Sequence, residues 1–405
     1  MSHPTGNQYV RNALRSLVEH DMLCEFWTTI AWNEDSVWNR TLPASLKRQL
    51  LRRSFRDVPQ EKLHSVPWRE IVRLGIRSTP IERTLCSDER AFSVIAMFRN
   101  FDERVAQRLS EVRPDGVYAH EGGARTTFRE ARELNIATLY ELPSGYWDWE
   151  CDLMREEEAL HPEFASVIPK LSDSAKHIQW KEEELALADC VFVPSEHVKR
   201  TLHGVVPQER IRVVQYGAPP VRSREVGDSS MGGPLKVVFA GALHQRKGIG
   251  YLLEAIDGMG MDAELTLIGQ RLAPNPIVDA ACSRWRWFES IPHEEVLDIM
   301  RGSDVLVLPS LSEGFGMVVT EALACGLPVI VTSNVGAGDV IRDGVEGFVV
   351  PIRSAEAIAE CLDRLHRDRT LLAEMSHNAQ CAAAENSWST YRERWVEAVG
   401  VAVCQ

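Results

Sequence analysis

The sequence predicts an α/β protein made of two doubly wound, parallel-sheet domains that face a deep cleft. Three observations predict this fold. At 405 residues the chain is too long for one compact core, and two domains of roughly 150–200 residues are expected. Short β-branched runs alternate with helical segments along almost the whole chain, as in parallel sheets with crossover helices. The pattern breaks once, near Gly217, in a polar and glycine-rich stretch typical of a linker.

The first domain is predicted to span residues 1–218. We expect its strands at residues 24–31, 116–119, 137–142, 190–193 and 211–215, with helices at 89–111 and 124–134. The loop at residues 3–7 comes almost at the start of the sequence. A first strand before it is therefore either clipped to a residue or two or supplied by residues outside this sequence.

A linker at residues 219–234 leads into a second Rossmann-like domain, residues 235–387. Its expected strands are 235–240, 264–268, 305–308, 328–331 and 347–350, and its expected helices are 248–255, 294–300, 317–324 and 355–365. The final segment, 388–405, is amphipathic and aromatic. In doubly wound sheets ligands bind outside the carboxyl ends of the strands, so the loops that leave strands are the candidate sites.

Composition excludes several classes of function. The formal net charge of −13 argues against a nucleic-acid binder that acts through its overall field. Nine scattered cysteines without a Cys-x-x-Cys pair indicate neither a disulfide framework nor a zinc site, and reduced thiols in a cytoplasmic protein are the simpler interpretation. The sequence has no apolar run of about 18 residues that would span a membrane, and its N-terminus is not that of a signal peptide.

Residues 40–77 are basic, with ten Lys or Arg against three acids, a net charge of +7. Leu46, Leu50, Leu51 and Phe55 recur among these cations at near-helical spacing. One interpretation is a basic amphipathic helix that contacts an anionic membrane surface. The other is a solvated helix that packs its leucines on its own domain.

The most informative segment runs from Asp304 to Ala322. A buried strand is predicted to end at Pro309, a loop carries Glu313, and Gly314 and Gly316 open a helix. Unpaired N–H groups at a helix start, together with the helix dipole, form a seat for phosphate.

Glu313 and Glu321 are eight residues apart. If the chain between them were all helix, their Cα atoms would be separated by about 12 Å along the axis. The acid and nucleophile of a retaining hydrolase need carboxyl groups about 5–5.5 Å apart. The two glutamates are therefore better placed to hold opposite ends of an extended ligand than to attack one bond together.

This segment, Pro-Ser-x-x-Glu-Gly-Phe-Gly with a second Glu after seven intervening residues, closely resembles the motif of family 4 retaining glycosyltransferases. The resemblance covers most of residues 110–385 and is strongest from 235 to 351. It implies the GT-B fold, with two Rossmann-like domains across a cleft. It also implies that Glu313 bonds the donor-sugar hydroxyls, that Glu321 bonds the nucleotide ribose, and that the N–H groups of Phe315 and Gly316 address the sugar.

A second motif, residues 238–248, combines a strand, a loop with two cations and a helix start. From Gly241 to Gly248 it matches the family pattern Gly-x-Leu-x-x-x-Lys-Gly, which makes Lys247 the expected diphosphate ligand and Arg246 a second one. Cationic donors suit a phosphate leaving group. Many family members carry Arg after the first Gly, where this chain has Ala242, so one phosphate contact is missing or comes from Arg246. A basic surface loop is the alternative.

Other loops support the same site. Gly269 follows the next strand and would border the nucleotide, and Ile291 lies where the family holds the base by backbone contacts. In the first half, His120 ends a predicted strand, where the family often has a histidine that contacts the donor sugar or the acceptor. A structural histidine is the alternative, with Glu121 as the group that faces the cleft.

Three further residues are assigned to the acceptor side. Tyr146 follows a strand and would stack on a sugar ring, and Gly6 and Asn7 would form the loop after the first strand. The C-terminal helix, 388–405, resembles the family's helix that packs back on the first domain.

The sequence therefore predicts a retaining, hexosyl-type glycosyltransferase. It would move a sugar from a nucleoside-diphosphate sugar to a hydroxyl of a glycan, a lipid-linked or a small-molecule acceptor, in glycan, glycolipid or glycoconjugate biosynthesis. We expect no cofactor besides this co-substrate, no metal, as is general for the GT-B type, and no nucleic-acid partner. The expected location is the cytoplasm, with peripheral contact to the inner membrane face through residues 40–77 as an open alternative. Two other functions remain: a catalytically silent GT-B domain that binds nucleotide or glycan, and a nucleotide-cofactor oxidoreductase, whose Gly-x-Gly-x-x-Gly turn and later acid are not found.

Overall fold

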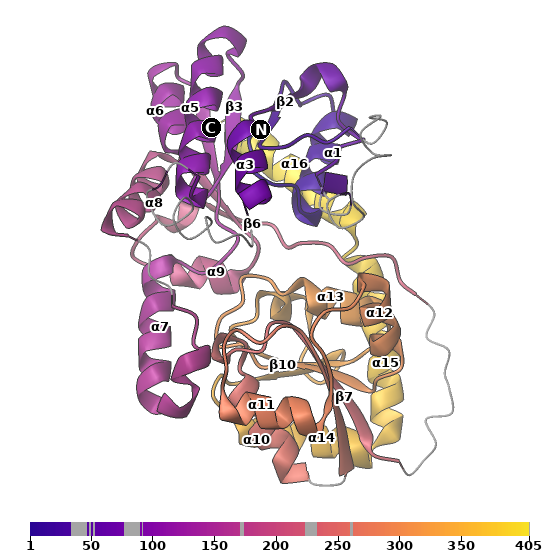
Figure 1. Ribbon diagram of the computed structural model, residues 1–405. Helices are drawn as coiled ribbons and strands as arrows, with labels where there is room; N and C mark the ends of the chain where they lie inside the picture. Colours follow the sequence, from indigo (N-terminus) through magenta and orange to yellow (C-terminus); the bar gives the residue numbers. More distant parts are fainter. Residues whose placement is uncertain are drawn as a thin grey trace.

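The computed structural model describes residues 1–33, 47, 50, 51, 53–76, 90, 92–170, 174–222, 233–259 and 262–404. Figure 1 shows two lobes, and each contains a parallel β-sheet with helices packed around it. We refer to them as the N-terminal lobe and the C-terminal lobe. This arrangement confirms the predicted α/β fold with two Rossmann-like sheets.

The C-terminal sheet has six parallel strands in the order β12-β11-β10-β7-β8-β9. All residues of the central strands β10 and β11 are buried, as expected for Val- and Leu-rich runs covered on both faces. The one strand of this sheet that was not predicted is β9, whose three residues are too few to show a period. The strands are β7 (Leu235–Ala240), β8 (Ala263–Ile268), β9 (Arg286–Phe288), β10 (Val305–Leu308), β11 (Val329–Thr332) and β12 (Gly347–Val350).

The N-terminal sheet consists of four parallel strands, β3-β4-β5-β6, and a two-stranded sheet, β1-β2. Ser2 forms a parallel bridge to Trp27 on one side and to Ala119 on the other, so a single residue joins the two parts. In this sequence, Ser2 thus occupies the place between β1 and β3 where a first strand of the sheet was expected. The strands are β1 (Phe26–Thr28), β2 (Leu63–Ser65), β3 (Gly116–His120), β4 (Ala137–Glu141), β5 (Cys190–Val193) and β6 (Ile211–Val213).

Helices connect these strands, and side chains fix several of their starts. Ser93 caps α5 by accepting a hydrogen bond from the N–H of Ala96, so this helix begins later than the predicted residue 89. In the N-terminal half the helices are α1 (Gln8–Glu19), α3 (Trp68–Ile76), α5 (Val94–Val112), α6 (Arg125–Glu133), α7 (Trp147–Leu160), α8 (Ala175–Leu187) and α9 (Glu196–Thr201). In the C-terminal half they are α10 (Ile249–Met259), α11 (Pro276–Arg284), α12 (His293–Arg301), α13 (Met317–Ala324), α14 (Ala355–Arg367), α15 (Arg369–Glu385) and α16 (Trp388–Val403).

Two helices lie with the lobe that they do not belong to by sequence. The C-terminal helix α16 runs up into the N-terminal lobe (Figure 1), where the ring of Trp395 contacts the ring of Tyr118 at 5.2 Å. The hydroxyl of Ser16 on α1 donates to the carbonyl of Arg392 on α16 at 2.7 Å. Helix α7 extends down beside the C-terminal lobe (Figure 1). The chain also crosses between the lobes near Ala218, which pairs with Ser387 just before α16.

The basic stretch at residues 40–77 lies partly outside the described residues, including Leu46. Among its described residues, Leu50 and Phe55 are buried, and Phe55 packs against Phe26 at 4.8 Å. Arg53 and Arg73 both bond the carboxylate of the buried Glu70 at 2.6 Å. These residues therefore follow the interpretation in which the stretch packs on its own domain. No helix within the described ranges has the length and apolarity needed to cross a membrane.

Candidate active site

The loops predicted to hold a donor all leave one edge of the C-terminal sheet. Gly241 follows β7, Gly269 follows β8, Ile291 follows β9 and Glu313 follows β10. Because these four parallel strands are neighbours in the order β10-β7-β8-β9, their carboxyl ends meet at the same edge. The N–H of Gly241 donates to Ile268 and the N–H of Gly269 to Phe288, both at 2.8 Å, which keeps the neighbouring loops in register.

The loop after β7 and the loop after β10 are held together by their backbones. The N–H of Leu311 donates to the carbonyl of Arg246 at 2.8 Å. Gly248 has a φ of +72°, and a Cβ atom at this position would lie 1.9 Å from the carbonyl oxygen of Pro309. Only glycine meets both conditions, so the second glycine of the motif allows the cationic loop to lie against the loop that carries Glu313.

Lys247 and Glu313 form an ion pair between these two loops. Both side chains are largely buried, with exposed fractions of 15% and 19%. Burial alone would raise the pKa of Glu313, but the Lys247 ammonium and, next, the Arg246 guanidinium lower it. The neighbouring His244 is buried, and burial and these two cations lower its pKa to about 4. The edge therefore combines an ionised carboxylate with two cations and a neutral imidazole.

Glu150, on α7, is a site residue that the sequence analysis did not identify. Its Oε2 lies 3.5 Å from Nη1 of Arg246, and its Oε1 accepts a 2.7 Å hydrogen bond from the hydroxyl of Ser312. Burial raises the pKa of Glu150, and Arg246 and Ser312 act against this rise. Ser312 precedes Glu313 directly, and its hydroxyl also lies 3.2 Å from Nε2 of His197 on α9. The N-terminal half of the chain thus supplies side chains to both loops.

The Gly314–Gly316 turn also lies against the N-terminal lobe. A Cβ atom on Gly314 would lie 2.0 Å from the carbonyl oxygen of Pro143, and the hydroxyl of Ser195 donates to the carbonyl of Gly314 at 2.7 Å. Gly316, with a φ of +89°, is the N-cap of α13. Within the described residues, no hydrogen bond uses the N–H of Phe315 or Gly316. These two donors at a helix start are the features that the sequence predicted for an anion seat.

Glu321 lies one turn into α13, at the other end of the same site. Its side chain is 15% exposed, and its Oε1 lies 3.7 Å from Nε2 of His293 at the start of α12. Burial raises the pKa of Glu321, while His293 lowers it. Since Ile291 comes two residues before His293, the carboxylate lies next to the loop predicted to hold a base. The helix begins at Met317, so the chain between Glu313 and Glu321 is only partly helical.

His120 is the last residue of β3 in the N-terminal lobe, and Glu121 follows it. The ring of His120 contacts the ring of the buried His3 at 4.4 Å, and its Nδ1 lies 3.0 Å from the carbonyl oxygen of Glu121. Burial lowers the pKa of His120, and Glu121 acts against this shift. Glu121 pairs with Lys181 of α8 at 3.3 Å. The negative charges of Glu313 and Glu121 both raise the pKa of Glu150. Carboxylates from both lobes therefore influence one another electrostatically.

The remaining acceptor-side residues have structural contacts. Tyr146 is 9% exposed, lies in the core of the N-terminal lobe and donates its backbone N–H to Thr201, so the contacts of this residue in the structure are packing contacts. Asn7 caps α1 by accepting from the N–H of Val10 at 3.1 Å. Gly6 packs against Phe55, whose ring atom would be 2.5 Å from an added Cβ.

A cavity of about 650 Å³ lies beside β2 and the residues that follow β1. Trp32, Asn33, Arg56 and Ser65 are among the residues that line it. It is polar, and the residues 31–33 that line one side of it follow the carboxyl end of β1, the end of a strand at which doubly wound sheets place ligands. In the parts of the chain that the structure describes, no three His, Cys, Asp or Glu side chains gather in a way that could hold a metal ion.

Comparison with known proteins shows similarity in sequence for the C-terminal lobe and similarity in fold for nearly the whole chain. A sequence profile described as glycosyl transferases group 1 matches residues 227–381. The D-inositol 3-phosphate glycosyltransferase of Rhodococcus erythropolis is 32% identical over 209 residues, which cover 46% of this chain and 47% of that protein. The chain spans about half the length of the curated relatives it matches.

Solved structures extend the likeness in fold to nearly the whole chain. The sucrose-phosphate synthase of Thermosynechococcus elongatus matches with a TM-score of 0.65 at 17% identity, over 97% of this chain and 93% of that one. The Anabaena protein HepE, solved in complex with UDP-glucose, matches with a TM-score of 0.62 at 14% identity, over 99% and 98%. The protein therefore has the two-lobed fold of the GT-B glycosyltransferases. Residues 227–381, most of the C-terminal lobe, are similar to the glycosyl transferases group 1 family.

Proposed function

We propose that the protein is a retaining glycosyltransferase that moves a sugar from a nucleoside-diphosphate sugar to an acceptor hydroxyl. The observation that carries this proposal is the pairing of Lys247 with Glu313 beside the N–H groups of Phe315 and Gly316, which make no hydrogen bond within the described part of the chain. One sheet edge thus presents a cation, a carboxylate and two backbone donors. Together these groups can bind a diphosphate and, at an adjacent position, sugar hydroxyls.

Each donor-site residue then has a distinct part. Lys247 and Arg246 bind the diphosphate, Glu313 and the N–H groups of Phe315 and Gly316 bind the sugar, and Glu321 binds the ribose. Gly241 and Gly269 border the nucleotide, and Ile291 the base. We take UDP as the first donor nucleotide to test, because HepE, a neighbour in fold, was solved with UDP-glucose.

In the proposed reaction, the bond from the anomeric carbon to the β-phosphate oxygen breaks while the acceptor oxygen bonds the same carbon on the same face. The acceptor proton passes to the departing phosphate. Lys247 and Arg246 stabilise the charge that develops on that phosphate, and electrostatic stabilisation of this kind commonly contributes most to catalysis. Lys247 leaves Glu313 for the phosphate and thereby frees the carboxylate for sugar hydroxyls. We assign His120 to the reacting sugar and propose that no metal takes part.

For the acceptor we propose the cavity beside β2, with Gly6 and Asn7 assigned to the same acceptor side and Glu121 toward the sugar. Its size and polar lining suit a glycan or the headgroup of a glycolipid. We also propose a peripheral membrane contact on the cytoplasmic face, supported by Trp68 and Ile71 on α3. Their exposed fractions are 52% and 55%, unusual for such residues on one short helix.

The first test is thermal unfolding with UDP, GDP, ADP and dTDP in turn, with and without EDTA. A ligand at about 100 times its dissociation constant adds about 2.7 kcal/mol, enough to raise the midpoint by about a degree or more. Turnover of the matching nucleotide sugar, with the product's anomeric configuration read by NMR, tests retention. Binding without turnover on any acceptor would favour the alternative, a silent GT-B protein. If none of the four nucleotides shifts the midpoint, the donor assignment is wrong.

A further inference from the structure

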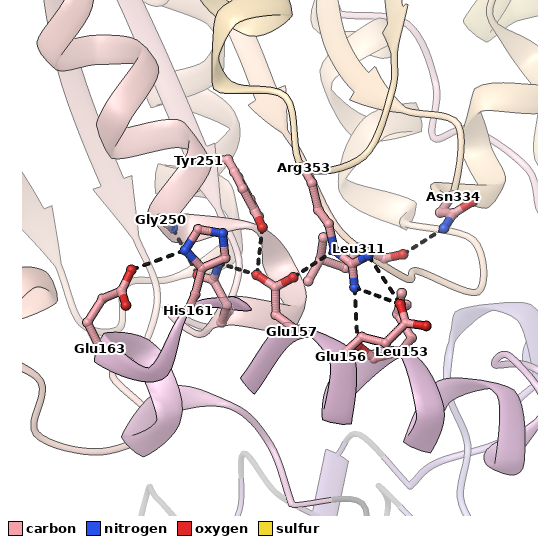
Figure 2. Close-up of polar contacts among 11 residues, drawn as sticks. Leu153, Glu156, Glu157, His161, Glu163, Gly250, Tyr251, Leu311, Asn334 and Arg353 are labelled. Carbon is pink, nitrogen blue, oxygen red and sulfur yellow. Dashed lines mark hydrogen bonds and ion pairs between the residues drawn. The ribbon is translucent and has the colours of Figure 1, made fainter. Parts of the chain in front are cut away.

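Helix α7 follows β4 of the N-terminal lobe, but its polar contacts go to the C-terminal lobe (Figure 2). Two of its carboxylates, Glu150 and Glu157, are seven residues apart and therefore lie on one face of the helix, about two turns from each other. Glu150 contacts Arg246 and Ser312. Glu157 contacts a second set of groups below the same loop.

Glu157 is completely buried and accepts three hydrogen bonds (Figure 2). Its Oε1 accepts from Nε2 of Gln245 at 2.7 Å and from the hydroxyl of Tyr251 at 2.8 Å, and its Oε2 accepts from Nε of Arg353 at 2.9 Å. A buried charge with a charged partner and two further donors is held in one geometry, because any shift would leave it unsatisfied.

Gln245 connects Glu157 to the cationic loop. It is the first residue of the short helix η5 (Gln245–Lys247), which contains Arg246 and Lys247. Its Oε1 accepts the N–H of Gly250 at 3.1 Å, and its carbonyl accepts the N–H of Gly248 at 2.7 Å. The side chain is thus fixed at both polar ends, with α7 at one end and the start of α10 at the other.

Arg353 fixes the other side of Glu157 from the loop after β12. It has a φ of +62°, a left-handed conformation that non-glycine residues rarely adopt. From this position its guanidinium also reaches Oε2 of Glu156 at 3.2 Å (Figure 2). Glu156 is 65% exposed, whereas Glu157 is buried, so the two neighbouring glutamates differ in how firmly they are held.

We propose that Glu157 is a positioning residue for the phosphate-binding turn, and that α7 is part of the donor site although its sequence belongs to the first half of the chain. Through Gln245 it sets where Arg246 and Lys247 lie relative to the loop of Glu313. This inference rests on the proposed function, since it assigns η5 to a diphosphate. It predicts a specific effect on the binding of phosphate, separate from the binding of the nucleoside.

The experiment measures the dissociation constants of UDP, by calorimetry, and of uridine, by competition, for the wild-type chain and its variants. Glu157→Leu and Gln245→Leu are each expected to weaken UDP about tenfold or more, the worth of one hydrogen bond near a charge, and uridine by less than twofold. Glu157→Gln keeps an acceptor for Gln245 and is expected to fall between these variants and the wild type. Glu156→Gln, which alters the same Arg353 at the surface, is the matched control and is expected to bind UDP as the wild type does.

Gln245→Leu keeps the proposal testable if Glu157→Leu does not fold, because it leaves the buried ion pair with Arg353 in place. Equal losses of UDP and uridine, or an unchanged UDP affinity in Gln245→Leu, would overturn the inference and leave the proposed function standing. A wild-type chain that binds neither UDP nor the other three nucleoside diphosphates overturns the proposed function, and this inference with it. A donor KM that rises in Glu157→Gln while kcat changes little would support it.

Discussion

Oε2 of Glu150, on helix α7, lies 3.5 Å from Nη1 of Arg246, in the loop after β7. One side chain comes from the N-terminal half of the chain and the other from the C-terminal half. The Glu150 carboxylate thus occupies one side of Arg246, the cation that we assign to the diphosphate. An arriving phosphate has to share Arg246 with this carboxylate or displace the carboxylate from it. A bound phosphate would therefore lie next to a negative carboxylate as well as next to positive side chains.

Replacing Glu150 with Gln should therefore strengthen UDP binding by about threefold or more, because a negative charge beside the phosphate is removed. The amide oxygen can still accept from Ser312, so the loop should keep its shape. Calorimetry measures the change. Asp148→Asn, an exposed change on the same helix, is the control. Weaker binding in Glu150→Gln would mean that Glu150 orients Arg246 rather than competing for it.

Lys247→Ala should weaken UDP by about 10- to 100-fold, the worth of a charge-assisted hydrogen bond of about 1.5–3 kcal/mol. It should leave uridine affinity nearly unchanged. The midpoint of thermal unfolding should also fall, because Glu313 then loses its ion-pair partner in a largely buried place. Lys236→Ala, on the exposed side of β7, is the matched control. Equal UDP affinity in both variants would remove Lys247 from the donor site.

Glu321→Ala tests the ribose assignment. The wild-type chain should prefer UDP over 2′,3′-dideoxy-UDP by about tenfold, one hydrogen bond to a carboxylate. The variant should bind both equally, at the weaker affinity. The exposed Glu295 on the neighbouring helix α12 provides the control, Glu295→Ala. A preference for the ribose that survives in Glu321→Ala would contradict the assignment.

Glu141, the last residue of β4, should make stability depend on pH. It is buried, its Oε2 has no hydrogen-bond partner in the described part of the chain, and burial raises its pKa from 4.5 to about 8, while the nearby Tyr118 and Tyr216 act against this rise. Between these two pKa values the folded state keeps a proton that the unfolded state has released. The free energy of unfolding therefore falls as pH rises through this window, by at most about 1.4 kcal/mol per pH unit.

In Glu141→Gln this contribution disappears, because the amide does not titrate. Chemical denaturation between pH 5 and pH 9 measures the free energy of unfolding of both proteins. The value for the variant should rise relative to that of the wild type up to a pH of about 8, and the difference should stay constant above that pH. The comparison isolates Glu141 from Glu184, whose pKa burial raises to about 7 and which titrates in both proteins. Parallel curves from pH 5 onward would show that Glu141 does not titrate in this window.

The proposed membrane contact is tested on α3. The double variant Trp68→Ser/Ile71→Ser should sediment with vesicles of phosphatidylglycerol and phosphatidylcholine several-fold less than the wild type, because about 2 kcal/mol or more of apolar burial is lost. Val401→Ser, at a residue that is 48% exposed on α16, is the control. Sedimentation that is equal for all three proteins, or absent from the wild type, would exclude α3 as a docking surface.

The sequence was sufficient where structure is local. The run Val305–Leu308 is long and apolar enough to indicate a buried strand, and the residues after it follow a spacing that fixes the turn and the start of α13. Glu313 and Lys247 meet because their strands are neighbours in the C-terminal sheet, which the doubly wound pattern implies.

It was insufficient where a helix docks on a distant surface. Helix α7 carries six acids, which are typical of a solvated helix, and nothing local separates the buried Glu157 from the exposed Glu156. Tyr146 was assigned to the cleft for a similar reason, because an aromatic residue in a loop fits a core and a ligand site equally well. Burial of this kind is decided by tertiary contacts, which one sequence does not display.

The reciprocal placement of α7 and α16 also determines how two chains of this fold can be recombined. Consider a chimera in which everything after residues 219–234 comes from another protein. Its new cationic loop would face the original α7, whose glutamates contact the original loop. Its new α16 would have to pack into the original aromatic core around Tyr118. The unit to exchange is therefore discontinuous in sequence. It comprises the C-terminal lobe together with α7 and without α16, and a graft that aims to transfer the proposed donor site should use those borders.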